Sequence, residues 1–314
     1  MAGMTRVAAI GECMIELRQL SEDRLELAFG GDTFNTAAYL SRVADGRLSV
    51  DYVTATGDDP YSDAMRAAFA REGVGTSGVS ILPGRLPGLY AIRVDARGER
   101  SFFYWRRESA ARSMLDGEAG ARLAAALPGY GWIYLSGITL SILAPEARER
   151  LFQALAAARA AGARVAFDTN YRPRGWPDAG EARATMTRAL GHCDLALPTF
   201  PDEQALFGDA SPRETAARMA RAGAREIAVK DGAGPVLLAG EAGLREVPCP
   251  PAARVVDTTA AGDAFNAGYI AARIRGLGPE AAAGAGSRLA GVVIGHRGAV
   301  IPREAMPAPH ELWP

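Results

Sequence analysis

The sequence is almost without lysine. Of its 35 lysine and arginine residues, 34 are arginine, and Lys230 is the only lysine. A compact ammonium group and a planar guanidinium group do different work, so a position that keeps lysine in such a chain attracts attention. We therefore treat Lys230 as a candidate functional residue, although chance alone also explains a single lysine.

Several other scarcities exclude classes of protein. The 35 basic residues are balanced by 36 acidic ones, so the net charge does not indicate nucleic acid as a partner. No apolar run reaches the roughly 18 residues of a membrane span. Glu12 interrupts the N-terminus before the apolar core of a signal peptide forms. Three scattered cysteines, Cys13, Cys193 and Cys249, indicate neither disulfides nor zinc. A cytoplasmic location is expected.

What is present is an alternation of short apolar runs with helical patterns, which is typical of an α/β protein with a mostly parallel, doubly wound sheet flanked by helices. Ligands of such sheets bind beyond the carboxyl ends of the strands. The whole chain, 1–314, is interpreted as one domain. The expected helices cover residues 32–43, 61–72, 145–161, 181–190, 212–222, 263–275 and 279–295.

Two segments break this alternation with short alternating strands, at about 13–29 and 88–106. The second contains a hairpin signal, Asp95 to Gly98. Together they predict about four antiparallel strands in a small inserted sheet. Such a sheet could serve stability alone, but we favour a lid over the strand ends.

The strongest local motif is DTTAAGDAFNAGY, residues 257–269. The small residues Ala260, Ala261 and Gly262 before a helix let backbone N–H groups converge on an anion. Asp263, beside that anion, could take a proton from a hydroxyl group. A lone aspartate at a helix start is more often an N-cap, but a cap needs no run of small residues before it.

This motif resembles the C-terminal signature of the ribokinase-like, or PfkB, carbohydrate kinases. Residues 30–37 (GGDTFNTA) resemble the family's sugar-binding segment, which implies that Gly31, Asp32 and Asn35 bind sugar. The resemblance covers nearly the whole chain and implies a ribokinase-like fold. Neither a Walker A motif nor the protein-kinase signatures occur.

Within the family, the resemblance is closest to kinases of 2-keto-3-deoxygluconate, a keto-deoxy sugar acid. It rests on residues 11–17, 86–90, 103–106, 170–173 and 297–302. The resemblance implies ATP-dependent, Mg²⁺-requiring phosphorylation of the terminal 6-hydroxyl, with Asp263 as base. A kinase of a neutral sugar such as fructose or ribose is the nearest alternative. A silent sugar-acid binding protein and a dinucleotide-dependent oxidoreductase are further ones, but the latter lacks Gly-x-Gly-x-x-Gly after the first strand.

The resemblance also implies the residues that contact the sugar acid. Arginine is the natural partner of a carboxylate, and Arg106 and Arg172 are the candidates. Tyr90 and Tyr104 offer hydroxyl groups to the sugar.

For the nucleotide, the resemblance implies that Asn170, Arg172 and Lys230 lie near the phosphates of ATP, with Ala260 and Gly262. Gly232 and Gly234 lie in the nucleotide-facing loop, and Ser287 lies near adenine. The family often has Asn-x-x-Glu near magnesium, whereas this chain has residues 199–202 (TFPD), so ligation of the metal by Asp202 is doubtful and the metal ligands are unknown. Related kinases often pair through their lid sheets, so a homo-oligomer is expected.

Overall fold

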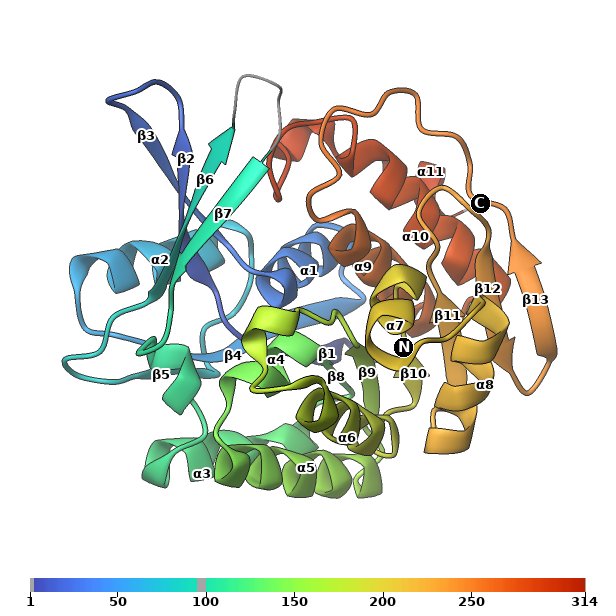
Figure 1. The fold of residues 1–314 in the computed structure, drawn as a ribbon, viewed down its shortest axis with the longest axis horizontal. Helices are drawn as coiled ribbons and strands as arrows, with labels where there is room; N and C mark the ends of the chain where they lie inside the picture. The colour runs from blue at the N-terminus through green and yellow to red at the C-terminus, as the bar shows by residue number, and fades with distance from the viewer. Residues whose placement is uncertain (1–2, 95–99, 314) are drawn as a thin grey trace.

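The computed structural model describes residues 3–94 and 100–313. The main sheet has nine strands in the order β13-β12-β11-β10-β9-β8-β1-β4-β5 (Figure 1). Strands β11 to β5 of this order pair in parallel, which confirms the predicted sheet. The strands are β1 (Thr5–Ile10), β4 (Leu48–Thr56), β5 (Val79–Ile81), β8 (Trp132–Ser136), β9 (Arg164–Asp168), β10 (Leu195–Ala196), β11 (Glu226–Val229), β12 (Val236–Gly240) and β13 (Gly243–Val247).

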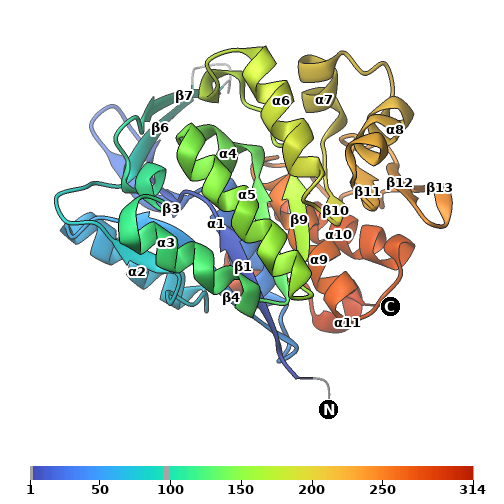
Figure 2. The ribbon, with the colours of Figure 1, turned by 90° about the horizontal axis from the view of Figure 1, so that it is seen from below.

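Helices cover both faces of this sheet, as Figure 2 shows. Their ends lie within about two residues of the predicted ones for the seven helices that the sequence indicates. The described helices are α1 (Asp32–Arg42), α2 (Pro60–Arg71), α3 (Gly117–Ala126), α4 (Gly137–Ile142), α5 (Pro145–Ala160), α6 (Ala179–Leu190), α7 (Phe200–Phe207), α8 (Pro212–Ala222), α9 (Ala261–Ile274), α10 (Pro279–Val293) and α11 (Pro309–Leu312).

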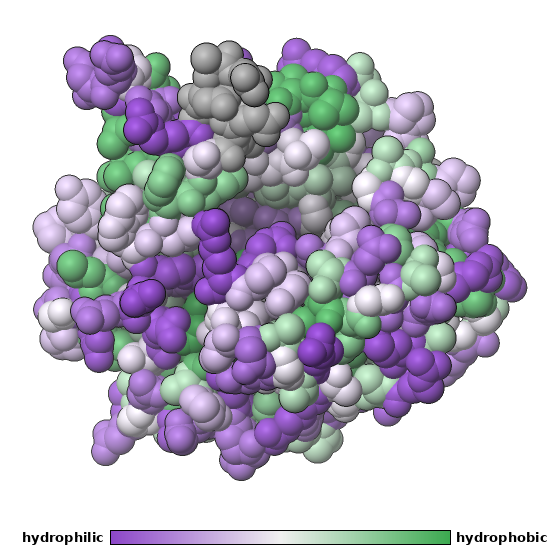
Figure 3. Space-filling model, viewed as in Figure 1, coloured by the Kyte–Doolittle hydropathy of each residue, from purple (hydrophilic) through white to green (hydrophobic). Residues whose placement is uncertain are grey.

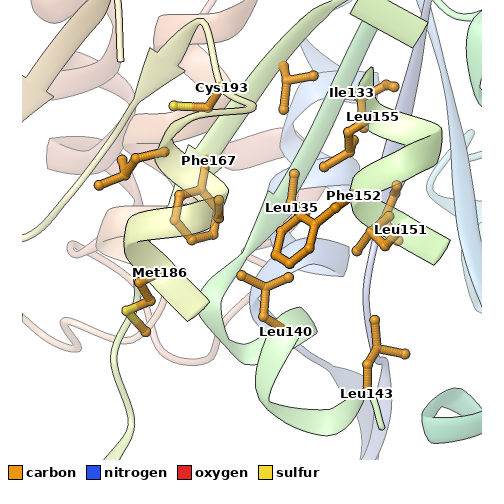
Figure 4. Packing of buried hydrophobic residues seen from close by; sticks show 14 of the residues in the cluster. Ile133, Leu135, Leu140, Leu143, Leu151, Phe152, Leu155, Phe167, Met186 and Cys193 are labelled. Carbon is orange, nitrogen blue, oxygen red and sulfur yellow. The ribbon is translucent and has the colours of Figure 1, made fainter. Parts of the chain in front are cut away.

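Two hydrophobic layers follow from the alternation of side chains along each buried strand. In β1, Val7 and Ala9 pack with α1, α2, α9 and α10, while Ala8 and Ile10 pack with α3, α5, α6 and α8 on the other face. Figure 4 shows part of the second layer, where Leu135 of β8 and Phe167 of β9 meet side chains of α4, α5 and α6. Strands buried on both faces explain why the sequence shows continuous apolar runs.

A second, four-stranded sheet, here called the small sheet, has the order β3-β2-β6-β7. Its strands are β2 (Met14–Gln19), β3 (Leu25–Gly30), β6 (Gly88–Val94) and β7 (Arg100–Trp105). The pairs β2–β3 and β6–β7 are antiparallel, as expected, but the central pair β2–β6 is parallel, so four antiparallel strands was wrong in that pair. Both central strands follow parallel strands of the main sheet and leave it in the same direction. The hairpin signal at 95–98 lies outside the described residues.

No helix within the described residues is long and apolar enough to cross a bilayer.

Two glycines bring α9 and α10 unusually close together. A Cβ atom on Gly268 would lie 2.9 Å from the Cα of Gly286, and one on Gly286 would lie 2.7 Å from the Phe265 carbonyl oxygen. The helix with the DTTAAGD motif is therefore held against its neighbour with no room for a side chain between them.

Candidate active site

Residues from α1, β9, β11 and α9 meet at the carboxyl edge of the main sheet, where the sequence predicts a ligand. Asn35 of α1 donates its side-chain amide to Asp263 Oδ2 of α9 at 2.8 Å. Asp32, at the start of α1, accepts a hydrogen bond from Asn170 Nδ2 at 2.7 Å. Asp32 and Asn35 both lie at the start of α1, so these two hydrogen-bonded pairs bring the predicted residues Asp32, Asn35, Asn170 and Asp263 together.

The carboxylates of this cluster perturb one another. Burial raises the pKa of Asp263 well above its ordinary value, and the charges of Asp32 and Asp168 add to the rise. Burial also raises the pKa of Asp32, partly offset by hydrogen bonds such as that from Asn170. A carboxylate with a raised pKa is a stronger base, which suits proton removal from a hydroxyl group.

Lys230 follows β11 and lies almost completely buried beside this cluster. Its Nζ donates to Asp168 Oδ2 at 3.0 Å and to Asn266 Oδ1 at 2.9 Å. Asn266 in turn donates to the same Asp168 oxygen at 2.6 Å. The single lysine is thus an internal cation, paired with Asp168 at the end of β9. Sequence reasoning missed Asp168 and Asn266, although Asp168 ends a predicted strand and Asn266 lies within the motif of residues 257–269.

The start of α9 has the geometry of an anion site. Ala260 adopts a left-handed conformation with φ 60°, which is uncommon for a residue with a side chain. The Ala261 N–H donates to the Thr258 carbonyl at 3.2 Å, so this amide is used internally. The N–H groups of Gly262 and Asp263 belong to the first turn, which has no acceptors within the helix. A Cβ on Gly262 would lie 3.6 Å from Lys230 Nζ, so the cation lies directly beside these amides.

Asn170 and Arg172 follow β9, as predicted. Asn170 has a positive φ of 33°, and its N–H donates to Asp168 Oδ1 at 3.1 Å. The Arg172 guanidinium pairs with Asp202 Oδ2 at 3.0 Å, and the Arg172 side chain as a whole is 55% exposed. Asp202, which stands where the family motif has a glutamate, is therefore engaged in an ion pair with Arg172.

The segment after β9 is held in place by a buried carboxylate, Glu203, that sequence reasoning did not identify. Glu203 accepts hydrogen bonds from Thr169 Oγ1 and, at 2.7 Å, from Arg218 Nη2. Burial raises the pKa of Glu203. These contacts attach α7 and α8 to the residue that precedes Asn170.

The small sheet and the residues that flank it contribute two further contacts with carboxylates, neither of which the sequence predicted. Arg106, which follows β7, forms an ion pair with Glu12, and the Tyr90 hydroxyl donates to Glu16. Tyr104 is 48% exposed and its ring lies 5.8 Å from that of Tyr90. Tyr104 is thus available to a ligand, whereas the Tyr90 hydroxyl already has an acceptor.

Gly31 has a steric role at the base of the small sheet. A Cβ atom at this position would lie 2.2 Å from the Glu12 carbonyl oxygen, so only glycine fits. Its own carbonyl accepts the Asn35 N–H at 2.8 Å. Gly31 therefore joins the segment of Glu12 to the first turn of α1.

The remaining predicted nucleotide residues fall in two places. Gly232, with φ 56°, and Gly234 form a tight turn after Lys230, closed by the Gly234 N–H on the Asp231 carbonyl at 2.8 Å. Ser287 of α10 lines a cavity of about 390 Å³ between that helix and the 250–254 segment. Its hydroxyl lies 3.5 Å from Cys249 Sγ.

The surface is hollowed between the small sheet and the main body, and hydrophilic residues line the hollow (Figure 3). Within the described residues, no group of three or more His, Cys, Asp or Glu side chains is arranged to hold a metal ion.

The family model for pfkB family carbohydrate kinases matches residues 4–306. The chain therefore belongs to the PfkB family of carbohydrate kinases, as its motifs indicate. The ribokinase-like fold is confirmed by a solved fructokinase from Xylella fastidiosa, determined with bound ATP, which superposes with a TM-score of 0.82 at 24% identity over 98% of this chain and 96% of that one.

Two sequence relatives are more similar. The 2-dehydro-3-deoxygluconokinase of Escherichia coli K12 is 46% identical over 308 residues, covering 96% of this chain and 99% of that protein. The 2-dehydro-3-deoxygluconokinase of Dickeya dadantii is 47% identical over 307 residues, covering 96% and 98%.

Proposed function

We propose that this chain phosphorylates 2-keto-3-deoxygluconate (2-dehydro-3-deoxy-D-gluconate) with ATP at the terminal 6-hydroxyl, giving the 6-phospho product and ADP. The observation that carries the proposal is Asp263, a buried carboxylate oriented by Asn35 at the start of an anion-binding helix. The resemblance to the sugar-acid kinases extends along nearly the whole chain, as the coverage of its relatives confirms.

Asp263 acts as the base. Its raised pKa favours removal of the proton as the hydroxyl oxygen attacks the γ-phosphorus atom. The O–P bond to the sugar forms, the bond from phosphorus to the bridging oxygen breaks, and ADP leaves. The N–H groups of Gly262 and Asp263 then face the charge that develops on the phosphoryl oxygens, with Lys230 behind them.

ATP extends from the start of α9 towards the cavity beside Ser287. That cavity is lined by small and apolar residues such as Gly291, Val292 and Ala253, which suit the flat face of a base. Gly232 and Gly234 form the turn that follows Lys230, and in this proposal that turn faces the nucleotide. Asn170 and Arg172 face the phosphates from the opposite side.

Mg²⁺ accompanies ATP in this proposal and supplies neutralisation of phosphate charge. The described residues offer no cage of three acidic, histidine or cysteine ligands, so phosphate oxygens and water would provide most of its coordination. Asp202 remains a poor candidate ligand because Arg172 holds it.

The small sheet acts as the lid, and Arg106 and Arg172 select for the acid. Both guanidinium groups lie in ion pairs that leave further N–H groups to donate to a substrate carboxylate. Tyr104 offers an exposed hydroxyl, and Tyr90 acts through its ring and through Glu16. A neutral sugar such as fructose has no carboxylate to accept from these remaining N–H groups, which is why the neutral-sugar alternative is less favoured.

We also propose a homo-oligomer in which a second copy covers the small sheet. Leu25 and Leu27 on one edge strand and Phe103 and Trp105 on the other are more than two-fifths exposed. Size-exclusion chromatography with light scattering tests this, and a monomer at assay concentration would contradict it. The cysteines are unpaired within the described residues, in keeping with the proposed cytoplasmic location.

The reaction itself is tested by incubating the purified chain with ATP, Mg²⁺ and 2-keto-3-deoxygluconate. Phosphorus NMR of the product should show one phosphate ester on the terminal carbon. A product phosphorylated elsewhere, or ADP and inorganic phosphate without a sugar phosphate, would contradict the proposal.

A further inference from the structure

Three buried polar atoms in or near residues 30–37, the predicted sugar-binding segment, have no hydrogen-bond partner within the described residues. They are Glu12 Oε1, Arg106 Nε and Asn35 Oδ1. Buried polar atoms are nearly always satisfied, because an unmade hydrogen bond costs about 1–3 kcal/mol. Two of these atoms belong to one ion pair, and the third belongs to the residue that orients Asp263.

The Glu12 side chain is completely buried, although it is charged. One oxygen, Oε2, accepts from Arg106 Nη2, and the other, Oε1, has no donor in the part of the chain that the structure describes. The exposed pair of Arg18 and Glu26 in the same sheet can complete its hydrogen bonds with water. Glu12 has no such access, so an ion-pair role alone leaves half of its carboxylate unexplained.

The chain is shaped closely around Glu12. A Cβ atom on Gly88 would lie 2.7 Å from Glu12 Oε1 and 3.1 Å from the Arg106 Cβ. A Cβ atom on Gly31 would lie 2.2 Å from the Glu12 carbonyl oxygen. Gly88 thus leaves room for the unpartnered side-chain oxygen, whereas Gly31 leaves room for the Glu12 backbone. Gly31 also links this segment through Asn35 to Asp263, because its carbonyl accepts the Asn35 N–H and the Asn35 side chain donates to Asp263.

The unpartnered atoms match the groups of a hydroxylated keto acid. Glu12 Oε1 and Asn35 Oδ1 can each accept a hydrogen bond from a hydroxyl group, and Arg106 Nε can donate one to a carboxylate or keto oxygen. A ligand that carried only the acid group would satisfy Arg106 and leave Glu12 buried without a donor.

We propose that Glu12 is a substrate-binding residue whose Oε1 accepts a hydrogen bond from a sugar hydroxyl other than the one that is phosphorylated. This inference rests on the proposed function. Glu12 then both orients Arg106 and distinguishes a hydroxylated acid from a plain one.

The test compares two substrates in the wild type and in Glu12→Gln. One is 2-keto-3-deoxygluconate, and the other is 6-hydroxy-2-oxohexanoate, which keeps the carboxylate, the keto group and the terminal hydroxyl but lacks the hydroxyls between them. Glutamine keeps the length of the side chain and removes the charge. Glu26→Gln, which breaks the exposed pair in the same sheet, is the matched control.

We expect Glu12→Gln to lower kcat/KM for the sugar acid by about ten- to a hundredfold, the size of one hydrogen bond to a charged group. The plain acid, measured by turnover or by its inhibition constant, should change by less than about threefold, as should the KM for ATP. The control should leave all three values unchanged.

An equal loss on both acids would mean that Glu12 only holds Arg106 and would overturn the proposal, as would no loss on either. Gly88→Ala provides a second route if Glu12→Gln folds poorly, because it displaces Oε1 without removing the charge and should show the same selective loss. A wild type that makes no ADP with the sugar acid would contradict the proposed function and the role of Glu12 together, whereas an active wild type with equal losses would overturn only the latter.

Discussion

Asn35 donates a hydrogen bond to Asp263 at 2.8 Å, although the two residues are 228 positions apart in the chain. One lies in the first turns of α1 and the other at the start of α9, and the two helices pack in the same hydrophobic layer. The segment that we propose to bind the sugar and the helix that we propose to bind phosphate are therefore joined directly by a hydrogen bond. Phosphoryl transfer from ATP to the sugar requires the two binding segments to lie side by side in this way.

The first prediction concerns the base. Asp263→Asn should retain binding of ATP and sugar acid but lose about 10²–10⁴ in kcat, since an amide has nearly the shape of the carboxylate and cannot take the proton. Isothermal titration for binding and steady-state ADP release for turnover check this. Near-wild-type turnover would remove Asp263 from the role of base.

The raised pKa of Asp263 also predicts a change in stability. Its folded-state pKa is higher than that of an exposed aspartate, so its stabilising contribution is complete at low pH and is lost as pH rises through the raised value. Asp263→Asn should therefore have a larger free energy of unfolding than the wild type at neutral pH, and the difference should shrink as pH is lowered. Urea unfolding at several pH values measures this, and a variant that is less stable at neutral pH would contradict it.

The third prediction concerns the single lysine. Lys230→Ala should raise the KM for ATP more than the KM for the sugar acid, because its charge lies beside the Gly262 amide. It also leaves Asp168 without its cation, which should lower stability by about 3–5 kcal/mol. Lys230→Arg should rescue only in part, since a planar fork replaces a compact ammonium group.

A double variant separates these effects. Lys230→Ala with Asp168→Asn removes both charges and should recover stability, measured by urea unfolding, without recovering the KM for ATP. If the single alanine variant keeps the wild-type kcat and KM for ATP, the lysine has no part in nucleotide binding.

The fourth prediction concerns selection for the acid. Arg106→Ala should lower kcat/KM for 2-keto-3-deoxygluconate by about ten- to a hundredfold, the value of one charge-assisted hydrogen bond, and should change weak activity on fructose by only a few-fold. Removing Arg106 also leaves Glu12 unpaired, but the comparison of two substrates cancels any loss of folded protein. Equal losses would show that Arg106 shapes the small sheet and does not contact the carboxylate.

The fifth prediction concerns the strained turn before α9. Ala260 has φ 60°, which glycine adopts freely and β-branched residues avoid. Ala260→Gly should keep activity, whereas Ala260→Val should lower both stability, by about 1–3 kcal/mol, and kcat. Thermal unfolding and ADP release measure the two effects, and an active, fully stable valine variant would contradict the role of this turn.

Much of the fold could be predicted from the sequence because local patterns determine it. The buried strands and the long helices have periodicities that indicate their type, and Pro212–Ala222 ends where its pattern ends. The hairpin β12–β13 was missed although β12 carries a buried apolar run, Val236 to Leu238, because its partner strand β13 is mostly exposed and has no such run. The parallel pairing of β2 with β6 was missed because it depends on how two distant strands leave the main sheet.

The candidate site was foreseen in its motifs but not in its pairings. Asp263, Asn35 and Lys230 were identified by their segments. Asp168, the partner of Lys230, and Glu12, the partner of Arg106, were not identified, since a carboxylate in a sequence does not show which cation it will meet. Such pairings follow from tertiary structure, and they decide which donors and acceptors remain for substrate.

The central claim is that this chain is a sugar-acid kinase, and one measurement tests it most directly. A coupled assay of ADP formation should compare 2-keto-3-deoxygluconate, gluconate, fructose and ribose at equal concentrations. The account predicts that kcat/KM for the keto acid exceeds that for fructose and ribose by at least about ten- to a hundredfold, the contribution of one arginine contact with the carboxylate. A higher kcat/KM for fructose or ribose than for the keto acid would contradict it.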